Sequence, residues 1–190
     1  MLNFKPFRNK EINLTELVAG LTRDDLYHLT NETIDSTLAQ IADCVDTDVT
    51  YTPLDPSAND PFAEKAEDVN LAWNLGHVIV HVTASAEESA AIAAELGRGV
   101  VYHGRSRYET PWESVTSITQ CRQRLEESRR LRIASLQMWP DIPHLENTYE
   151  GWPGAPVMNA IGRFVYGLIH NDSHVEQVTD IISQAKAARV

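Results

Sequence analysis

Two pairs of histidines in the sequence have the spacing of a metal-binding helix. His170 and His174 stand four residues apart near the end of the chain, and His77 and His81 repeat this spacing in the middle. Because an α-helix turns once every 3.6 residues, side chains four positions apart point toward nearly the same side. Imidazole is the commonest protein ligand for transition metals, so each pair could bind one ion. A lone histidine at a helix edge is more often a hydrogen-bonded or partly exposed residue, and spacing alone leaves both interpretations open.

The histidines have the same relation to the apolar residues in both segments. A helical wheel places each pair on a shoulder of its helix, between the apolar stripe and the solvated face. Near the end of the chain, Arg163, Tyr166 and Gln177 share this shoulder with His170 and His174. The sequence therefore predicts two helices that present histidines in equivalent positions.

Four long stretches of helical period are expected to position these residues. The first begins at "TRDD" (22–25) and ends near 44–46, and the second begins between Asp60 and Asp68 and ends at "ELGRG" (95–99). The third begins at "TPWE" (110–113), where Thr110 and Glu113 can form a capping box, and continues until Pro140. The fourth starts near Pro156 and continues to about Lys186.

Four helices without an alternating strand pattern predict an all-α fold, a four-helix bundle with a long loop between the first two helices. A chain of 190 residues is expected to form a single domain, residues 1–190, with an N-terminal arm at 1–23. The loop at 46–61 is rich in Pro, Asp and Asn, and long ordered loops often border sites. In such bundles, sites are built from side chains on facing helices.

Composition narrows the class of partner. The formal net charge is −11 and the pI is about 5.0, which argues against binding to nucleic acid or to an acidic membrane surface. No apolar run is long enough for a membrane span, and the first residues lack the apolar core of a signal peptide. Cys44 and Cys121 are too few for a disulfide framework and are expected to be buried. A cytoplasmic location is the expectation.

Two motifs together resemble a known group of proteins. The segments "NLAWNLGHVIVH" and, far downstream, "RFVYGLIHNDSHVEQV" are similar to those of the DinB-like (YfiT-like) superfamily of four-helix-bundle proteins, which includes metalloenzymes. The segment "RSRYETPWESV" also resembles the entry to the third helix of that family. The likeness covers the expected bundle, roughly from Asp24 to Ala185.

The resemblance implies a set of site residues. It makes His77, which follows "WNLG", the first metal ligand, His170 and His174 the other two, and Gln177 the polar residue that trails them. His81 is a departure from the family pattern, and a fourth ligand, a proton shuttle and no role all stay open for it. Three further residues are candidates for the pocket wall: Trp73, Tyr166 and, by analogy, Arg107, which could reach an anionic group.

Three neutral imidazoles would leave coordination positions free, which is typical of catalytic metal sites. Zinc or nickel is the expected divalent ion, and iron or copper also suits imidazole. Such an ion activates water or a thiol, and relatives in the superfamily use low-molecular-weight thiols such as bacillithiol or mycothiol. The expected function is thus a thiol S-transferase or hydrolase acting on a small molecule. The resemblance also implies a homodimer.

Other functions stay open at this point. A di-iron bundle is disfavoured because no histidine has a glutamate three residues before it, and a zincin is excluded because H-E-x-x-H is absent. The strongest alternative is a non-catalytic helical bundle, related to stress response or dimer assembly, in which the metal serves as a staple. A helix-pairing module with incidental histidines is a third possibility.

Overall fold

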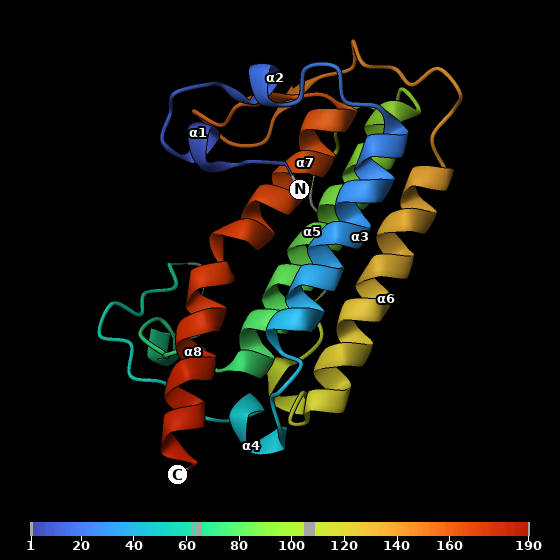
Figure 1. The fold of residues 1–190 in the computed structure, drawn as a ribbon. Helices are drawn as coiled ribbons and strands as arrows, with labels where there is room; N and C mark the ends of the chain where they lie inside the picture. Colours follow the sequence, from blue (N-terminus) through green and yellow to red (C-terminus); the bar gives the residue numbers. More distant parts are fainter. Residues whose placement is uncertain (1, 62, 64–65, 105–108, 190) are drawn as a thin grey trace.

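The computed structural model describes residues 2–61, 63, 66–104 and 109–189. The protein is predominantly helical, as predicted for an all-α fold (Figure 1). The long helices are α3 (Arg23–Gln40), α5 (Leu75–Gly97), α6 (Ile118–Gln137), α7 (Ala160–Ser173) and α8 (Val175–Ala188). They run side by side, with α8 continuing the line of α7 beyond a bend (Figure 1). Helix α5 packs against both α6 and α7, and α3 covers α6 and α7 from the other side.

Short elements close the two ends of these helices. The N-terminal arm forms α1 (Lys5–Arg8) and α2 (Leu14–Leu17), and α4 (Asp46–Val49) follows α3. Two 3-10 turns, η1 (Ala66–Asp68) and η2 (Trp112–Ser114), precede α5 and α6. The strands β1 (Tyr149–Glu150) and β2 (Val157–Met158) pair antiparallel, with Tyr149 opposite Met158. The prediction of negligible strand content is confirmed for the described residues.

The first helix begins where the sequence predicts. Thr22 is the N-cap of α3: its hydroxyl accepts from the Asp25 N–H, and the Asp25 carboxylate accepts from the Thr22 N–H. This reciprocal capping satisfies two N–H groups that the helix leaves without partners. The helix ends at Gln40, a few residues before the predicted end, because the chain turns at 41–44 and starts α4, which the Asp48 carboxylate caps.

The predicted starts of the second and third helices are wrong. Helix α5 begins at Leu75, where the Asn74 side chain accepts from the His77 N–H, and not between Asp60 and Asp68; its end at Gly97 is confirmed. Helix α6 begins at Ile118, after a capping box between Ser117 and Gln120. The predicted box at Thr110 does not form the start of this helix, and η2 occupies that stretch instead.

The predicted fourth helix is two helices. Its N-terminal residues near Pro156 belong to β2, and α7 begins only after Asn159, whose side chain accepts from the Gly162 N–H. The chain leaves helical bonding at His174, after which α8 continues to Ala188. The pattern of apolar residues is continuous across this break, so periodicity alone could not reveal it.

Two groups of buried apolar residues form the core. One lies toward the α1–α2 end and includes Leu26, Phe164 and Leu168; the other lies toward the α4 end and includes Ile34, Ile79 and Ile181. Both predicted buried cysteines, Cys44 and Cys121, are in the second group and are free. None of the helices in the described part of the chain is long and apolar enough to cross a membrane.

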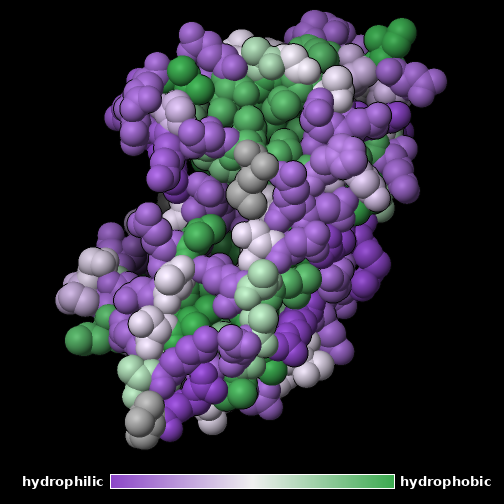
Figure 2. All heavy atoms as spheres, in the orientation of Figure 1, coloured by the Kyte–Doolittle hydropathy of each residue, from purple (hydrophilic) through white to green (hydrophobic). Residues whose placement is uncertain are grey.

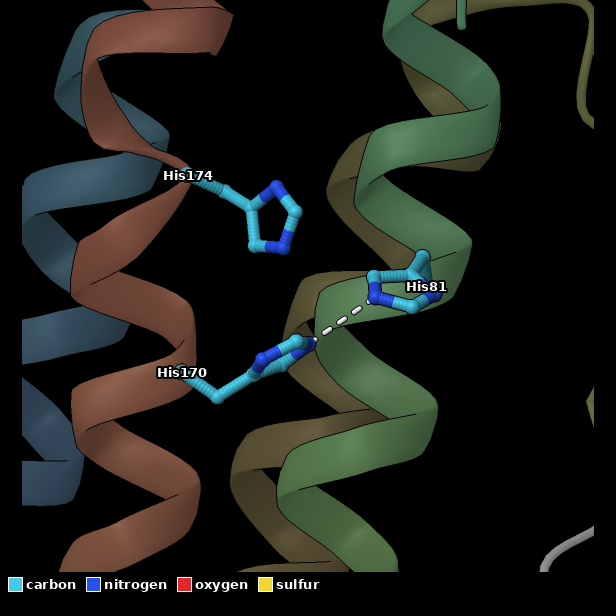
Figure 3. Close-up of side chains that lie close together, drawn as sticks. All are labelled: His81, His170 and His174. Carbon is cyan, nitrogen blue, oxygen red and sulfur yellow. Dashed lines mark hydrogen bonds between the residues drawn. The ribbon is translucent and has the colours of Figure 1, made fainter. Parts of the chain in front are cut away.

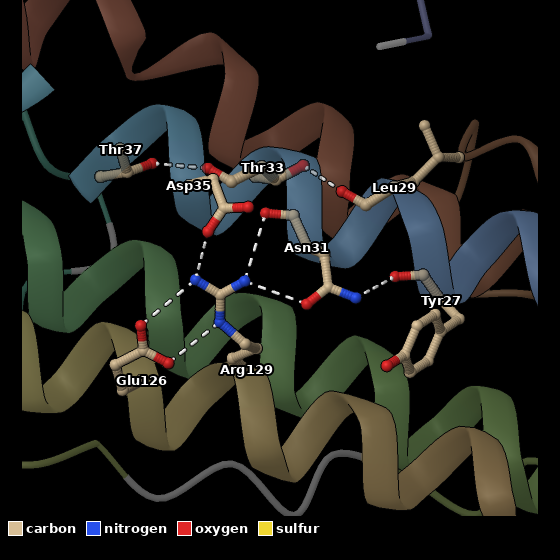
Figure 4. Close-up of polar contacts among 8 residues, drawn as sticks. All are labelled: Tyr27, Leu29, Asn31, Thr33, Asp35, Thr37, Glu126 and Arg129. Atoms are coloured by element: carbon tan, nitrogen blue, oxygen red, sulfur yellow. Dashed lines mark hydrogen bonds and ion pairs between the residues drawn. The ribbon is translucent and has the colours of Figure 1, made fainter. Parts of the chain in front are cut away.

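The seam between α3 and α6 is held by a polar network on the outside of the molecule (Figure 4). Arg129 of α6 donates to Asp35 at 2.6 Å and to the Asn31 side-chain oxygen at 2.9 Å, both on α3. Its Nε also donates to Glu126, one turn earlier on α6, at 3.0 Å. All three nitrogens of the Arg129 guanidinium group therefore have acceptors.

Candidate metal centre

Three imidazoles converge in the space between α5 and the α7–α8 junction (Figure 3). His81 comes from α5, His170 from α7, and His174 from the break between α7 and α8. One nitrogen from each ring lies within 4.8 Å of the others. The Nε2 atoms of His81 and His170 are 2.9 Å apart, so one of these nitrogens donates a proton to the other. All three rings are partly buried, which limits but does not close access from solvent.

The close packing of α5 on α7 explains why two of these rings meet. A Cβ placed at Gly167 would lie 2.6 Å from the Cβ of Ser89, a separation that real atoms do not tolerate. Glycine at this position therefore lets the two backbones approach, one turn before His170 on α7. Because the two helices are this close, the imidazoles of His81 and His170 bridge the remaining gap directly.

The break at His174 aims the third ring at the same place. The Ser173 hydroxyl donates to the His170 carbonyl at 2.6 Å, and the His174 N–H donates to the Asn171 carbonyl at 3.2 Å. The hydroxyl thus takes the acceptor that the His174 N–H would use in a regular α-helix. Arg8 of the N-terminal arm forms an ion pair with Asp172 at 2.9 Å, beside the break. The helix changes direction here (Figure 1).

Outer polar groups engage the second nitrogen of two of the rings. The Gln177 side-chain oxygen lies 2.7 Å from Nδ1 of His174, so Nδ1 carries the proton and Nε2 is left for the centre. The Glu109 carboxylate lies 3.8 Å from Nδ1 of His81, whose Nε2 faces His170. Gln177 thus lies within hydrogen-bonding distance of the His174 ring. An acceptor that is hydrogen-bonded to the outer ring nitrogen orients a histidine side chain, as Gln177 does for His174. The Glu109 carboxylate, at 3.8 Å, is within the range of an ion pair but not of a hydrogen bond.

Burial favours the neutral form of the His174 ring. The pKa of His174 is lowered because its partly buried surroundings disfavour a charged imidazolium, while the hydrogen bond to Gln177 acts in the opposite direction. A neutral imidazole is the form that can donate a lone pair to a cation. His174 is therefore ready to act as a ligand at neutral pH.

His77 does not join this group, in contrast to the ligand set implied by the resemblance. Its ring is stacked between Trp73 and Trp112, with centroid distances of 4.4 and 4.6 Å. Its Nδ1 is buried and has no hydrogen-bond partner among the described residues. Burial lowers the pKa of His77 to about 4. His81, one turn further along α5, is the α5 histidine that lies in the three-histidine group with His170 and His174.

A small cavity opens beside His174. It has a volume of about 200 Å³, and its walls include Trp73, Gln177 and loop residues from Asp55 to Asp60. The outline of the molecule is hollowed at this level, between the N-terminal arm and the segment that precedes α5 (Figure 2). The long loop predicted to border the site does line this cavity. Trp73 lies outside α5 and contacts the rings of both His81 and His174, at centroid distances of 4.6 and 6.0 Å.

The remaining candidates have other surroundings. Tyr166 packs against Trp152 and the core group at the α1–α2 end, one turn away from His170. Arg163 is buried two turns before His170. Arg107 lies outside the described residues. The sequence analysis did not identify Glu109 as a neighbour of His81. The only feature that pointed to it is that it is a carboxylate in the segment before the third helix.

The three nitrogens fit a divalent transition ion. Ligand nitrogens at about 2.0–2.1 Å from a tetrahedral zinc ion lie roughly 3–3.5 Å from one another. The His81–His170 pair, at 2.9 Å, is already close to this separation, and rotation of side chains would bring in His174 from within 4.8 Å. The hydrogen bond that joins Nε2 of His81 to Nε2 of His170 places a proton where a cation would lie between them.

Comparison with known proteins adds no relative: no family model, no curated protein and no solved structure matches this chain.

Proposed function

We propose that the protein is a metal-dependent enzyme of the DinB-like type, in which His81, His170 and His174 hold a divalent transition ion, zinc or nickel first. The observation that carries this proposal is the convergence of one nitrogen from each of these three rings within 4.8 Å. The proposed reaction is transfer of a low-molecular-weight thiol or hydrolysis of a small substrate. When bound, such an ion supplies Lewis acidity, which lowers the pKa of a water or thiol that contacts it.

The protein's own residues have distinct parts in this proposal. Gln177 fixes the tautomer and direction of the His174 ring, and Glu109 stands opposite Nδ1 of His81. Trp73 covers one side of the imidazoles with an apolar surface that keeps bulk water away. The cavity beside His174 offers the small substrate a place next to the centre.

The lack of a fourth imidazole favours catalysis over a purely structural ion. A closed structural site commonly has four protein ligands, whereas catalytic sites keep a position open. Among the described residues, the cluster contains three histidines and no Cys, Asp or Glu ligand, and His77 is held between two indoles. The position that His77 would occupy in a closed site is thus available to a reactant.

The family assignment and the dimer stay proposals with their own support. The long helices run side by side, the second part of the first motif lies on α5, and the second motif lies on α7–α8; this arrangement supports the bundle that the resemblance implies. Light scattering of the purified protein tests whether it forms the homodimer.

The decisive experiment is metal analysis of the purified full chain after incubation with zinc or nickel and removal of free ion. One ion per chain is expected for the wild type and for His77→Phe, and less than a tenth of that for His81→Ala and His174→Ala. A screen with thiol cosubstrates and small hydrolysable esters then uses His174→Ala as its inactive control. Absence of stoichiometric metal in the wild type, unaffected by His174→Ala, would refute the proposal.

A further inference from the structure

The cavity beside His174 has an acidic wall. Its volume is about 200 Å³, and two of its wall residues, Asp55 and Asp60, carry carboxylates. Among the described residues that line it, there is no lysine or arginine. The pKa of His174 is lowered because burial disfavours the imidazolium, so this ring adds no positive charge at neutral pH. The described part of the wall is therefore negatively charged.

A short turn fixes the carboxylate of Asp55 in the loop. Its Oδ1 accepts from the N–H of Ser57 at 3.0 Å and from the Ser57 hydroxyl at 2.7 Å. Both donors are uncharged, so the turn holds the side chain and leaves its negative charge in place. Asp55 is half-buried, which reduces the screening of this charge by solvent ions. A molecule in the cavity therefore lies in the field of a carboxylate whose place is fixed.

Further carboxylates act on the same region. Burial lowers the pKa of His77, and the negative charges of Asp60, Glu113 and Asp68 act in the opposite direction. The His77 ring is stacked on Trp73, which is itself part of the cavity wall. Interactions between partly buried charges extend beyond direct contact, so the field that reaches His77 also reaches the cavity. An anionic group would be repelled there, and a cationic group would be attracted.

The uncharged part of the wall favours an organic cation. Ala58, Leu71 and Trp73 add apolar surface to the cavity. An alkylammonium ion can place its carbon chain against this surface and its charge toward the carboxylates. A hydrated inorganic ion gains nothing from the apolar part. Charge and apolar surface together therefore select an amine.

We propose that the substrate of this site is a small amine, whose ammonium group binds in the cavity beside Asp55 and Asp60 while its reacting end faces the three histidines. Combined with the thiol chemistry proposed above, the substrate class is an aminothiol. The thiol part of this inference rests on the proposed function. The ammonium part rests on the cavity alone and does not require a metal.

The first arm of the test uses the metal-free full chain. Propylamine, propanol and butyrate share a propyl group and differ in charge. Binding is followed by NMR through the indole N–H signal of Trp73 in ¹⁵N-labelled protein, which Trp73→Phe identifies. We expect a saturable shift with propylamine, binding at least about fivefold weaker for propanol, and weaker still for butyrate. Asp55→Asn should weaken propylamine about threefold or more.

The second arm uses the zinc-loaded chain and isothermal titration. Cysteamine, mercaptoethanol and mercaptopropionate have the same two-carbon chain between the thiol and the group that varies. Because these thiols differ in acidity, the measured quantity is the affinity ratio of cysteamine to mercaptoethanol, compared between wild type and variants. We expect this ratio to fall about threefold or more in Asp55→Asn, and about tenfold or more when Asp60→Asn is added.

The variants are matched in size and charge. Asparagine at position 55 keeps the side-chain oxygen that accepts from Ser57, so the turn is retained. Asp141→Asn removes the same charge at an exposed position that lies after α6, in the wall of the separate cavity near the start of α3. It should leave both the propylamine affinity and the cysteamine ratio unchanged.

The outcomes separate this inference from the proposed function. If the chain binds no zinc but propylamine shifts the Trp73 signal and Asp55→Asn weakens it, the metal-dependent function fails and the ammonium site stands. If zinc and mercaptoethanol bind but the ratio is equal in wild type and in both aspartate variants, the inference is overturned and the function stands. Tighter binding of butyrate than of propylamine would also overturn it, in favour of an anionic group opposite Arg107.

Discussion

The two long seams of the molecule use polar residues in opposite ways. Between α3 and α6, the guanidinium of Arg129 has acceptors on both helices, from Asp35, Asn31 and Glu126 (Figure 4). Between α5 and α7, the polar groups that meet are imidazoles, and the close contact is one histidine Nε2 against another (Figure 3). The first seam is complete without any added group. The second is a set of lone-pair donors that needs a proton or a cation between them.

The comparison shows which polar residues serve to join helices and which are candidates for ligand binding. The acceptors around Arg129 lie on the surface, so the network joins two helices at modest energetic gain. The histidines lie partly buried beside a cavity, where three like side chains do little for packing. A cluster of three imidazoles whose nitrogens converge on one place is the one to test for metal ions.

The largest effect is expected from removal of one ring at the second seam. His81→Ala should weaken zinc binding by at least about 100-fold, because it removes one of three proposed ligands. His77→Phe should bind zinc as the wild type does, since His77 is stacked between two tryptophans. Isothermal titration with zinc measures both. The reverse ranking would restore His77 as the ligand and contradict the geometry.

The residue that orients His174 should have the next largest effect. Gln177→Leu removes the acceptor on Nδ1 of His174 and keeps the size of the side chain. We expect zinc affinity to fall about 10- to 100-fold, as for other outer partners of histidine ligands. Gln184→Leu, about two turns further along α8, where Gln184 bonds to Leu54 and Asp180, is the matched control. Equal affinities for wild type and Gln177→Leu would show that the hydrogen bond does not position the ring.

Stability at mildly acid pH should depend on His77. Its folded-state pKa is lowered to about 4 from 6.5 by burial, so between these values the unfolded chain binds the proton and the folded chain does not. The stability is therefore full above pH 6.5 and falls as the pH decreases toward 4. Allowing for partial exposure of the ring, we expect the loss to be about 1–2 kcal/mol.

His77→Phe keeps the stack with the tryptophans and should remove this part of the acid sensitivity. Urea unfolding at several pH values between 4 and 7, in the absence of metal, gives the difference between variant and wild type. His28→Phe, at an exposed position, is the control and should retain the wild-type slope. A wild-type slope in His77→Phe would assign the acid sensitivity to other groups.

The smallest effect is expected at the first seam. Arg129→Met should destabilise the protein by about 0.5–1 kcal/mol, because the partners Asp35 and Glu126 stay hydrated after the guanidinium is lost. Arg130→Met, the exposed neighbour on α6, should change stability by less. Zinc affinity should stay the same in both variants. A large loss of zinc affinity in Arg129→Met would mean that the two seams are coupled.

Local signals in the sequence predicted some helix ends well and others badly. The Thr22–Asp25 box starts α3 as expected, and α5 ends as expected at Gly97, followed by Arg98 as C-cap and by Gly99 with a positive φ. Before α5, the chain offers Asp60 with Pro61 as well as Asn74, and before α6 both Thr110 and Ser117. Each of these side chains is able to cap a helix. The choice depends on tertiary contacts, such as the Val115 carbonyl, which lies so close to Gly76 that a Cβ there would be 2.5 Å away.

The same limit applies to the candidate site. The pairs of histidines and the place of Gln177 on the same helix shoulder follow from spacing, but His77 and His81 share one face of a helix and spacing does not separate them. The separation comes from Trp73, which lies before α5 and stacks on His77. A helix that began before Asp68 would have placed Trp73 one turn away on the same shoulder. The late start at Leu75 thus decides which imidazole reaches the centre.

The one-residue interruption at His174 has a mechanical consequence. It makes this histidine the pivot between two rigid rods, of which α7 carries His170 and α8 carries Gln177. A swing of α8 about the pivot would move the third ring and its amide partner together, while His81 and His170 keep their separation. Because Arg8 pairs with Asp172 just before the pivot, the N-terminal arm is in a position to set the angle of that swing.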